Sequence, residues 1–303
     1  MIPPLINGAF HIDASTLAGR FMWCHREYEY YHYHKRESSA FKAGLRFGSF
    51  CHDELLAPHY RGTIVDIDAA LPRMHPELAN DYRNAGYAKV LWKLYNDTYQ
   101  NEPFSVVDTP PEMGLPGNKA VELPFALPIG EVAFRSEIIP VIWTGKIDLL
   151  VHWPSEDISH IDHKTKSVGG ESAWDEFVNS IQQLGYAWAI SKLFGHIPSS
   201  FCINLILTRK LTATGKGIEL VRQRFPLTAE AVNEVPERIM SVVAQIFDCY
   251  DRGYFPMYDT SCTRKWGKCE YIDVCKQAAA QRMQMLSTGL FKQVTWSPLT
   301  GET

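Results

Sequence analysis

The 303-residue sequence lacks any apolar run long enough to cross a membrane, and its start lacks a basic segment followed by an apolar one. These absences argue against a spanning or exported protein, so we expect an intracellular, cytoplasmic one. A basic excess is also missing, since the net charge is −4, and any nucleic acid must therefore be bound by local patches. No internal repeat or low-complexity tract occurs, which excludes a repeat array.

What is present is the composition of a globular protein, with 46% hydrophobic and 21% charged residues. A chain of this length can form one large domain or two small ones. It contains seven cysteines. Without an export signal, these favour metal ligation or buried thiols over a disulfide framework.

The apolar pattern changes period along the chain. Helical spacing dominates up to about residue 99, and residues 102–118, with four prolines and two glycines, are predicted to be a loop. The rest predicts an α/β core: strands in 120–166, a helix in 174–193, strands in 201–208 and 218–225, and a helix in 229–250. We therefore divide the chain into an N-terminal helical region (1–119), a core (120–252) and a cysteine-rich C-terminal segment (253–303).

Two strand-like runs, TGKIDLLVHW and ISHIDHKT, flank a predicted turn at Pro154–Glu156. A hairpin symmetric about Ser155 pairs residues whose numbers add to 310, which places Asp148 opposite Asp162. Lys164 lies two residues further on and projects from the same face as Asp162. The hairpin thus predicts two carboxylates and an ammonium in one small volume.

Carboxylates among apolar neighbours are costly to bury unless a charge compensates them, and a divalent cation compensates both at once. Mg²⁺ or Mn²⁺ held by oxygen ligands would polarise a phosphodiester and lower the pKa of a bound water, while the lysine would stabilise the transition state. The alternative is an ordinary surface hairpin with a salt bridge of little consequence. Spacing alone leaves both interpretations open.

These motifs resemble the PD-(D/E)xK nuclease superfamily, and in particular its RecB-like exonuclease branch. The resemblance rests on Gly145 to Asp148 as a Gly-x-x-Asp motif and on Asp162 to Lys164 as Asp-x-Lys. It also rests on a Gln-x-x-x-Tyr motif at Gln182 and Tyr186, and on Phe-Gly-x-x-x-His in RFGSFCH, which ends at His52. It implies a restriction-endonuclease-like core, a mixed central sheet flanked by helices, and it covers Cys24 to Cys275, although residues 57–119 match no part of the pattern.

The resemblance also implies roles for single residues. Asp148, Asp162, Lys164, Gln182 and Tyr186 are the expected catalytic residues. His52, Asp148, Asp162 and the main-chain carbonyl of His163 are the expected Mg²⁺ or Mn²⁺ ligands. Gln182 and Tyr186, four apart on a helix, share one face, where Gln182 can hold Lys164 or the DNA backbone. Gln183 is a rival for the glutamine.

Three cysteines lie within fourteen residues near the C-terminus, at Cys262, Cys269 and Cys275. The RecB-like nucleases that carry an iron–sulfur cluster combine three such cysteines with one near the N-terminus, which here corresponds to Cys24. The resemblance therefore implies a [4Fe-4S] cluster, with a structural Zn²⁺ as the alternative, since thiolates bind both. The remaining three, Cys51, Cys202 and Cys249, have apolar neighbours and are expected to be buried thiols.

The expected activity is a DNA exonuclease that acts on single-stranded or frayed ends in recombination, repair or DNA processing. Two alternatives remain: a structure-specific endonuclease with the same centre, and a non-catalytic DNA-binding scaffold. No protein partner can be named. Candidate DNA contacts combine basic with aromatic residues; they are His34, Lys35 and Arg36; Arg209 and Lys210; and Arg264, Lys265 and Lys268 with Trp266.

Overall fold

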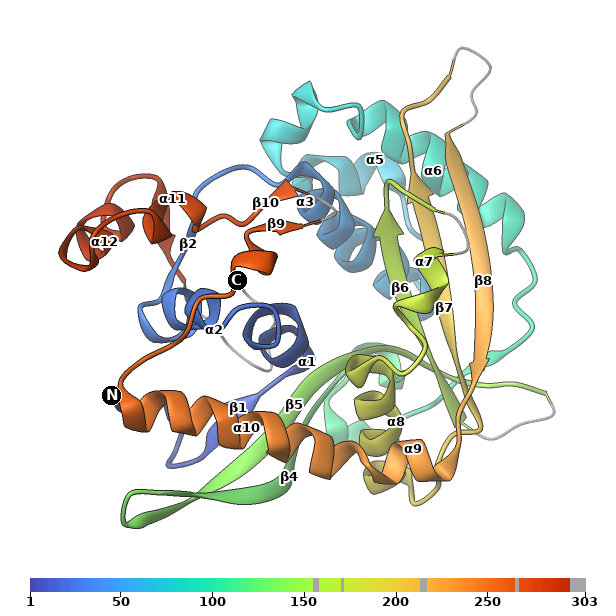
Figure 1. The fold of residues 1–303 in the computed structure, drawn as a ribbon. Coiled ribbons are helices and arrows are strands. Elements are labelled where there is room, and N and C mark those ends of the chain that lie inside the picture. The colour runs from blue at the N-terminus through green and yellow to red at the C-terminus, as the bar shows by residue number, and fades with distance from the viewer. Residues whose placement is uncertain (155–157, 170–171, 213–216, 265–266, 295–303) are drawn as a thin grey trace. The chain divides into compact units, whose positions relative to one another are not determined.

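A computed structural model describes residues 1–154, 158–169, 172–212, 217–264 and 267–294. Its centre is a mixed seven-stranded sheet flanked by helices, with β1-β5-β6-β7-β8 as the strand order and with β3 and β4 also paired to β5 (Figure 1). This is the α/β architecture expected from the sequence. Two long strands, β4 (Val121–Phe134) and β5 (Glu137–His152), contribute to both of the compact units into which the chain divides.

The second unit comprises residues 41–123 and 147–232. Its strands β6, β7 and β8 lie side by side (Figure 1). The elements of this unit are α3 (Ala43–Phe50), η3 (Cys51–Leu56), α4 (Ala57–Tyr60), α5 (Ile67–Ala70), η4 (Leu71–Arg73), η5 (Pro76–Asn80), α6 (Ala85–Thr98), β3 (Ser105–Val106), η6 (Pro111–Met113), η7 (Pro116–Asn118), β6 (Ile158–Lys166), α7 (Ser172–Asp175), α8 (Ile181–Phe194), β7 (Ser200–Thr208), β8 (Ile218–Pro226) and α9 (Ala229–Asn233).

The register between β5 and β6 is the predicted one. Leu149 pairs with Ile161 and Leu150 with His160, so the numbers of each pair add to 310. The turn residue Ser155 lies outside the described residues. β7 runs parallel to β6 and antiparallel to β8, and all nine of its residues are buried. Burial on both faces explains why its sequence, SFCINLILT, is almost wholly apolar.

The core of the second unit forms where α3, η3 and α6 pack on the sheet. Phe47, Leu55 and Leu91 from these helices belong to the same buried cluster as Leu149 and Ile161 from the sheet. Helix α6 begins at Asn84, whose side chain accepts a hydrogen bond from the Tyr87 main-chain amide, as an N-cap residue does. This helix, α6, is the last of the helical elements expected up to about residue 99.

The first unit comprises residues 1–40, 124–146 and 233–303. Its strand β1 runs parallel to β5, with Phe10 opposite Val141. Its elements are β1 (Phe10–Ile12), α1 (Ala14–Thr16), η1 (Leu17–Phe21), α2 (His25–Tyr28), η2 (Glu29–Tyr33), β2 (Arg36–Ser38), α10 (Val235–Arg252), η8 (Asp259–Ser261), β9 (Thr263–Arg264), β10 (Gly267–Lys268), α11 (Ile272–Cys275), α12 (Ala279–Leu286) and β11 (Phe291–Gln293).

Three expectations from the sequence need adjustment. The helix expected over 174–193 begins only at Ile181, where α8 starts, because α7 ends at Asp175 and residues 176–180 are not helical. The helix expected over 229–250 is interrupted: α9 ends at Asn233, and α10 begins at Val235 with Pro236 in its first turn, a position that proline favours. The expected loop at 102–118 contains the short elements β3, η6 and η7. The first unit takes residues from all three segments that the sequence led us to expect. The division into an N-terminal region, a core and a C-terminal segment stays a prediction. No helix among the described residues is long and apolar enough to span a membrane.

Candidate metal centre and active site

Three side chains of the second unit form the one group of potential metal ligands found among the described residues. His52 on η3, Glu122 at the start of β4 and Asp148 on β5 place their ligand atoms within 4.8 Å of one another. His52 Nδ1 lies 3.6 Å from Asp148 Oδ2 and 3.9 Å from Glu122 Oε1. One nitrogen and two carboxylates are a donor set that suits a divalent cation.

Helix α3 places His52 through a close contact with the sheet. A Cβ at Gly48 would lie 2.7 Å from the Thr165 Oγ1 atom of β6. Only glycine lets the helix backbone approach the strand this closely. Phe47, which is fully buried, anchors the same turn, so the Phe-Gly-x-x-x-His pattern has a packing reason as well as a chemical one.

Glu122 was missed by the sequence reasoning. It lies between the buried residues Val121 and Leu123 and has φ +56°, a left-handed conformation that is unusual for a residue with a side chain. The only signal in the sequence is an acid flanked by apolar residues just before Pro124. That signal is too weak to distinguish a ligand from an exposed strand residue.

Asp162 and Lys164 are adjacent to each other on β6 but outside this group of three. Lys164 Nζ donates to Asp162 Oδ1 at 2.8 Å and forms an ion pair with Asp162 Oδ2 at 2.7 Å. The Asp162 side chain is buried, while Lys164 keeps more than a quarter of its surface exposed. The expected carboxylate–ammonium pair is therefore present, with the ammonium accessible to a substrate.

Helix α8 brings Gln183, the rival residue, to this pair. Gln183 Nε2 donates to Asp162 Oδ2 at 3.1 Å, and its Oε1 lies 2.9 Å from His160 Nε2. Gln183 is fully buried. Gln182 Nε2 instead donates to the Tyr186 hydroxyl at 3.1 Å, so these two share one face as predicted but bond to each other.

The main chain of His163 connects two members of the group. Its N–H donates to Asp148 Oδ2 at 2.8 Å, and its carbonyl oxygen lies 2.9 Å from His52 Nε2. The His163 carbonyl, an expected metal ligand, thus has His52 as its partner here. This contact fixes the orientation of His52, because only Nε2 can donate to the carbonyl, and Nδ1 is then the ring nitrogen that faces the carboxylates.

The charged side chains around this group shift one another's pKa values. Burial, with the negative charges of Asp162 and Glu122, raises the pKa of Asp148 to about 7. Burial lowers the pKa of His52, but Asp148 and Glu122 outweigh it and raise that pKa to about 9. Burial likewise opposes the effect of Asp162 and Asp148 on Lys164, whose pKa is raised overall. Carboxylates held this close favour a bound cation.

The four cysteines expected to bind a cluster all lie in the first unit. Cys24 precedes α2, Cys275 ends α11, and the Cys269 N–H donates to the Cys262 carbonyl at 2.9 Å. Cys269 and Cys275 pack against one hydrophobic cluster that includes Tyr30. Burial raises the pKa of Cys275, and the proximity of Cys24 also raises it.

The three cysteines expected to be core thiols are buried. Cys51 and Cys202 are fully buried, and Cys249 is 4% exposed, which confirms that prediction. Among the candidate DNA contacts, Arg209 and Lys210 are exposed, whereas Lys265 and Trp266 lie outside the described residues.

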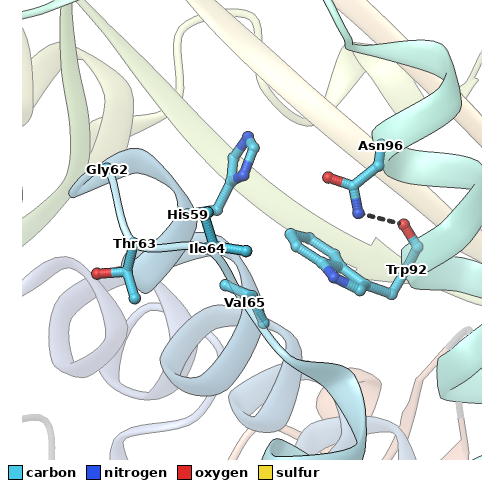
Figure 2. Close-up of a pocket in the computed structure, with 7 residues that line it drawn as sticks. All are labelled: His59, Gly62, Thr63, Ile64, Val65, Trp92 and Asn96. Atoms are coloured by element: carbon cyan, nitrogen blue, oxygen red, sulfur yellow. Dashed lines mark hydrogen bonds between the residues drawn. The ribbon is translucent and has the colours of Figure 1, made fainter.

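A separate cavity of about 470 Å³ opens in the second unit (Figure 2). His59 of α4 and the segment Gly62, Thr63, Ile64 and Val65 line one side, and the Trp92 and Asn96 side chains of α6 line the other. The imidazole of His59 meets the Trp92 indole nearly edge-on, with ring centroids 5.5 Å apart. None of its lining residues was predicted from the sequence, and none belongs to the candidate metal group.

The fold and the site define an α/β protein with a candidate divalent-metal centre on its central sheet. The chain belongs to the PD-(D/E)XK nuclease superfamily, because the model of that superfamily matches residues 16–276. No curated protein matches the sequence.

The solved structures that align with the chain include two with low sequence identity. One is a Eubacterium rectale protein described as a "Putative exonuclease", with 14% identity and TM-score 0.50 over 92% of this chain and 93% of that one. The other is SSO0001, with 11% identity and TM-score 0.33 over 78% and 79% of the two chains. At 14% identity, the similarity to the Eubacterium rectale protein shows a shared fold and nothing more.

Proposed function

We propose that this chain is a metal-dependent deoxyribonuclease that hydrolyses phosphodiester bonds from DNA ends, preferring single-stranded or frayed ones. The observation that carries the proposal is the convergence of His52, Glu122 and Asp148 within 4.8 Å in a member of a nuclease superfamily. The description of the Eubacterium rectale protein as a "Putative exonuclease" also supports the proposal of an exonuclease. The scaffold alternative is disfavoured, because a protein that only binds DNA has no need of this group beside Asp162 and Lys164.

The donor set fits Mg²⁺ or Mn²⁺. The ion would be held by His52 through Nδ1, by Glu122 and by Asp148. Asp162 is a further candidate ligand, since its negative charge is close enough to raise the pKa of Asp148. The His163 carbonyl remains a candidate too, because an oxygen that accepts from His52 keeps a second lone pair. A bound ion of this kind polarises a phosphodiester and neutralises the charge that develops on it.

The chain's own residues have separable tasks in this proposal. Lys164, held by Asp162, places a positive charge where the phosphate becomes more negative, which stabilises the transition state. Gln183, which is buried, donates to the Asp162 carboxylate and holds it in place. Gln182 is partly exposed and bonded to the buried Tyr186, and it is the candidate for contact with the DNA backbone.

The test is digestion of end-labelled single-stranded and linear duplex DNA with Mg²⁺ or Mn²⁺. Asp148→Asn and Lys164→Met should abolish cutting while the protein stays folded, whereas Asp97→Asn on the exposed face of α6 should cut normally. Covalently closed circular DNA separates the two nuclease types: an exonuclease leaves it intact, and cleavage of the circle as fast as of linear DNA indicates the endonuclease instead. Absence of cutting in every case refutes the nuclease proposal.

We further propose that Cys24, Cys262, Cys269 and Cys275 bind a [4Fe-4S] cluster in the first unit. All four residues lie in that unit, and no three of the described cysteines place their sulfur atoms within 4.8 Å of one another. Ligands of a tetrahedral Zn²⁺ at about 2.3 Å from the metal would meet that spacing. A cluster needs wider spacing, since each thiolate binds a different iron atom.

Anaerobic purification followed by iron, acid-labile sulfide and zinc analysis tests this assignment. We expect about four irons and four sulfides per chain in a [4Fe-4S] site, lost in Cys275→Ser and retained in Cys249→Ser. Cys249 is the matched control, because it is a buried cysteine of the same unit outside the proposed set. Zinc without sulfide establishes the structural zinc site.

A further inference from the structure

A largely buried polar network, whose two charged members are partly exposed, lies on the face of β6 opposite Asp162 and Lys164. It consists of Glu102, Arg222, Tyr60, Tyr95 and Asn204, all in the second unit, and we call it the Arg222 network. Side chains alternate along a strand, so the His163 ring points to this face while its neighbours point to the active site. Asn204 Nδ2 lies 2.8 Å from His163 Nδ1.

Arg222 is the centre of the network. Its guanidinium forms a two-bond ion pair with Glu102 and donates to the Tyr60 and Tyr95 hydroxyls at 2.8 and 3.1 Å. Its Nε donates to Asn204 Oδ1 at 3.2 Å. Arg222 thus uses the planar fork of donors that distinguishes arginine from lysine.

The direction of each hydrogen bond toward His163 is fixed. Because Asn204 Oδ1 accepts from Arg222, its Nδ2 group must donate, to His163 Nδ1 and to the Tyr95 hydroxyl at 3.0 Å. The His163 ring therefore carries its proton on Nε2. The Tyr60 ring stacks on the same imidazole, with centroids 5.5 Å apart and planes 14° apart, so the ring is held in both orientation and tautomer.

Stability alone does not explain this arrangement. A buried ion pair seldom improves on well-packed apolar residues of the same volume, because both charges must leave water. A fully bonded buried network does restrict its members to one geometry. The main chain of His163, which the network restricts, holds two of the three candidate ligands: its N–H bonds Asp148 and its carbonyl bonds His52.

We propose that the Arg222 network is a positioning device, which fixes His163 so that its main chain sets the spacing of Asp148 and His52 for metal binding. This rests on the proposed metal-dependent function. Arg222, Asn204 and Tyr60 are thus positioning residues, and they act on the metal site without touching it.

The test measures Mn²⁺ affinity without DNA, by the electron paramagnetic resonance signal of free Mn²⁺, together with kcat and KM for single-stranded DNA. Asn204→Leu keeps the side-chain volume but removes the donor to His163, and Arg222→Lys keeps the charge but loses the fork. We expect the Mn²⁺ Kd to rise about 10- to 100-fold, as for other residues that orient metal ligands. Excess Mn²⁺ should restore much of the cleavage rate.

Arg224→Lys is the matched control. Arg224 lies two residues along the same strand, and its guanidinium donates to Ser200 Oγ at 2.7 Å and covers the Trp153 ring. This variant should bind Mn²⁺ like the wild type. If Asn204→Leu fails to fold, Tyr60→Phe replaces it, because phenylalanine keeps the stacked ring and removes only the hydroxyl.

The outcomes separate the two proposals. A wild-type Kd in folded Asn204→Leu and Tyr60→Phe, with lowered thermal stability only, overturns the positioning role and leaves the nuclease proposal intact. A wild-type protein that binds Mn²⁺ without cutting DNA overturns the nuclease, while the Kd values still decide the positioning role. A wild-type protein that binds no Mn²⁺ overturns both.

Discussion

Replacing Gln183 by methionine tests which glutamine of α8 serves the active site. Methionine has a similar length and no polar amide, so the change removes two hydrogen bonds with little loss of volume. Asp162 Oδ2 then loses the donor at 3.1 Å, and His160 Nε2 loses the acceptor at 2.9 Å. Among the side-chain hydrogen bonds and ion pairs of the described residues, the Asp162 carboxylate then retains only those with Lys164.

The size of the effect follows from burial. Gln183 and His160 are fully buried and Asp162 is 1% exposed, so water cannot replace the missing partners. A hydrogen bond to a charged group contributes about 1.5–3 kcal/mol, and an unsatisfied buried group costs about 1–3 kcal/mol. If the loss falls on the transition state through a displaced Asp162–Lys164 pair, cleavage slows about 10- to 150-fold.

The assay compares kcat on end-labelled single-stranded DNA for Gln183→Met and Gln182→Met, with thermal unfolding of both. Gln182→Met is the comparison, because it removes only a neutral bond to Tyr186, which contributes about 0.5–1.5 kcal/mol. Even if that whole loss fell on the transition state, kcat would fall only about 2- to 13-fold, and a lost contact with the DNA backbone would raise KM instead. A larger loss in Gln182→Met than in Gln183→Met would refute the assignment of Gln183.

Three further predictions concern other parts of the molecule. Glu122→Gln should weaken Mn²⁺ binding about tenfold or more, since the group loses one of its two carboxylates; calorimetric titration measures the change. Gly48→Ala should destabilise the fold by about 1–3 kcal/mol, because the new Cβ meets Thr165 Oγ1; urea unfolding measures it. Burial, then Arg20 and Lys35, lowers the pKa of His32 well below 6.5. Folded His32 thus resists protonation, and the free energy of unfolding decreases as the pH falls below about 6.5. Between pH 7.5 and 5.5, the free energy of unfolding of His32→Gln should decrease by about 1.4 kcal/mol less than that of the wild type. Urea unfolding at both pH values measures the difference.

Each of these has its own check. Glu112→Gln, on an exposed turn, should leave Mn²⁺ binding unchanged, and equal weakening in both variants contradicts the role of Glu122. Thr165→Ala should restore the stability of Gly48→Ala, because it removes the atom in contact; no recovery means that the contact is not the cause. If the free energy of unfolding of His32→Gln decreases as much on acidification as that of the wild type, groups other than His32 cause the decrease.

The hairpin was predictable because the period of a strand is two. Once a turn is placed, alternation fixes which residues are opposite, and the pairs from Leu149 with Ile161 onward follow that rule. The architecture follows from the same periodicities, which separate helix from strand. Both are local properties of the sequence.

The choice between Gln182 and Gln183 was not predictable in the same way. Adjacent helix residues point about 100° apart, so a small rotation of α8 decides which one reaches Asp162. That rotation depends on how the helix packs on the sheet, which no local pattern specifies. Glu122 was hidden for a related reason: its position depends on a left-handed residue at the start of β4, and glutamate carries no sequence signal for that conformation.

The division of the chain has a consequence for synthesis on the ribosome. The second unit is built from residues 41–123 and 147–232, whereas the first needs residues 1–40, 124–146 and 233–303. Since a chain emerges from its N-terminus onward, the residues of the candidate metal centre are all available once residue 232 has appeared. The first unit must wait for its final segment, which carries three of the four candidate cluster cysteines. Insertion of the proposed cluster would thus be a late event, and the part of the chain that holds His52, Asp148 and Lys164 has the opportunity to fold before it.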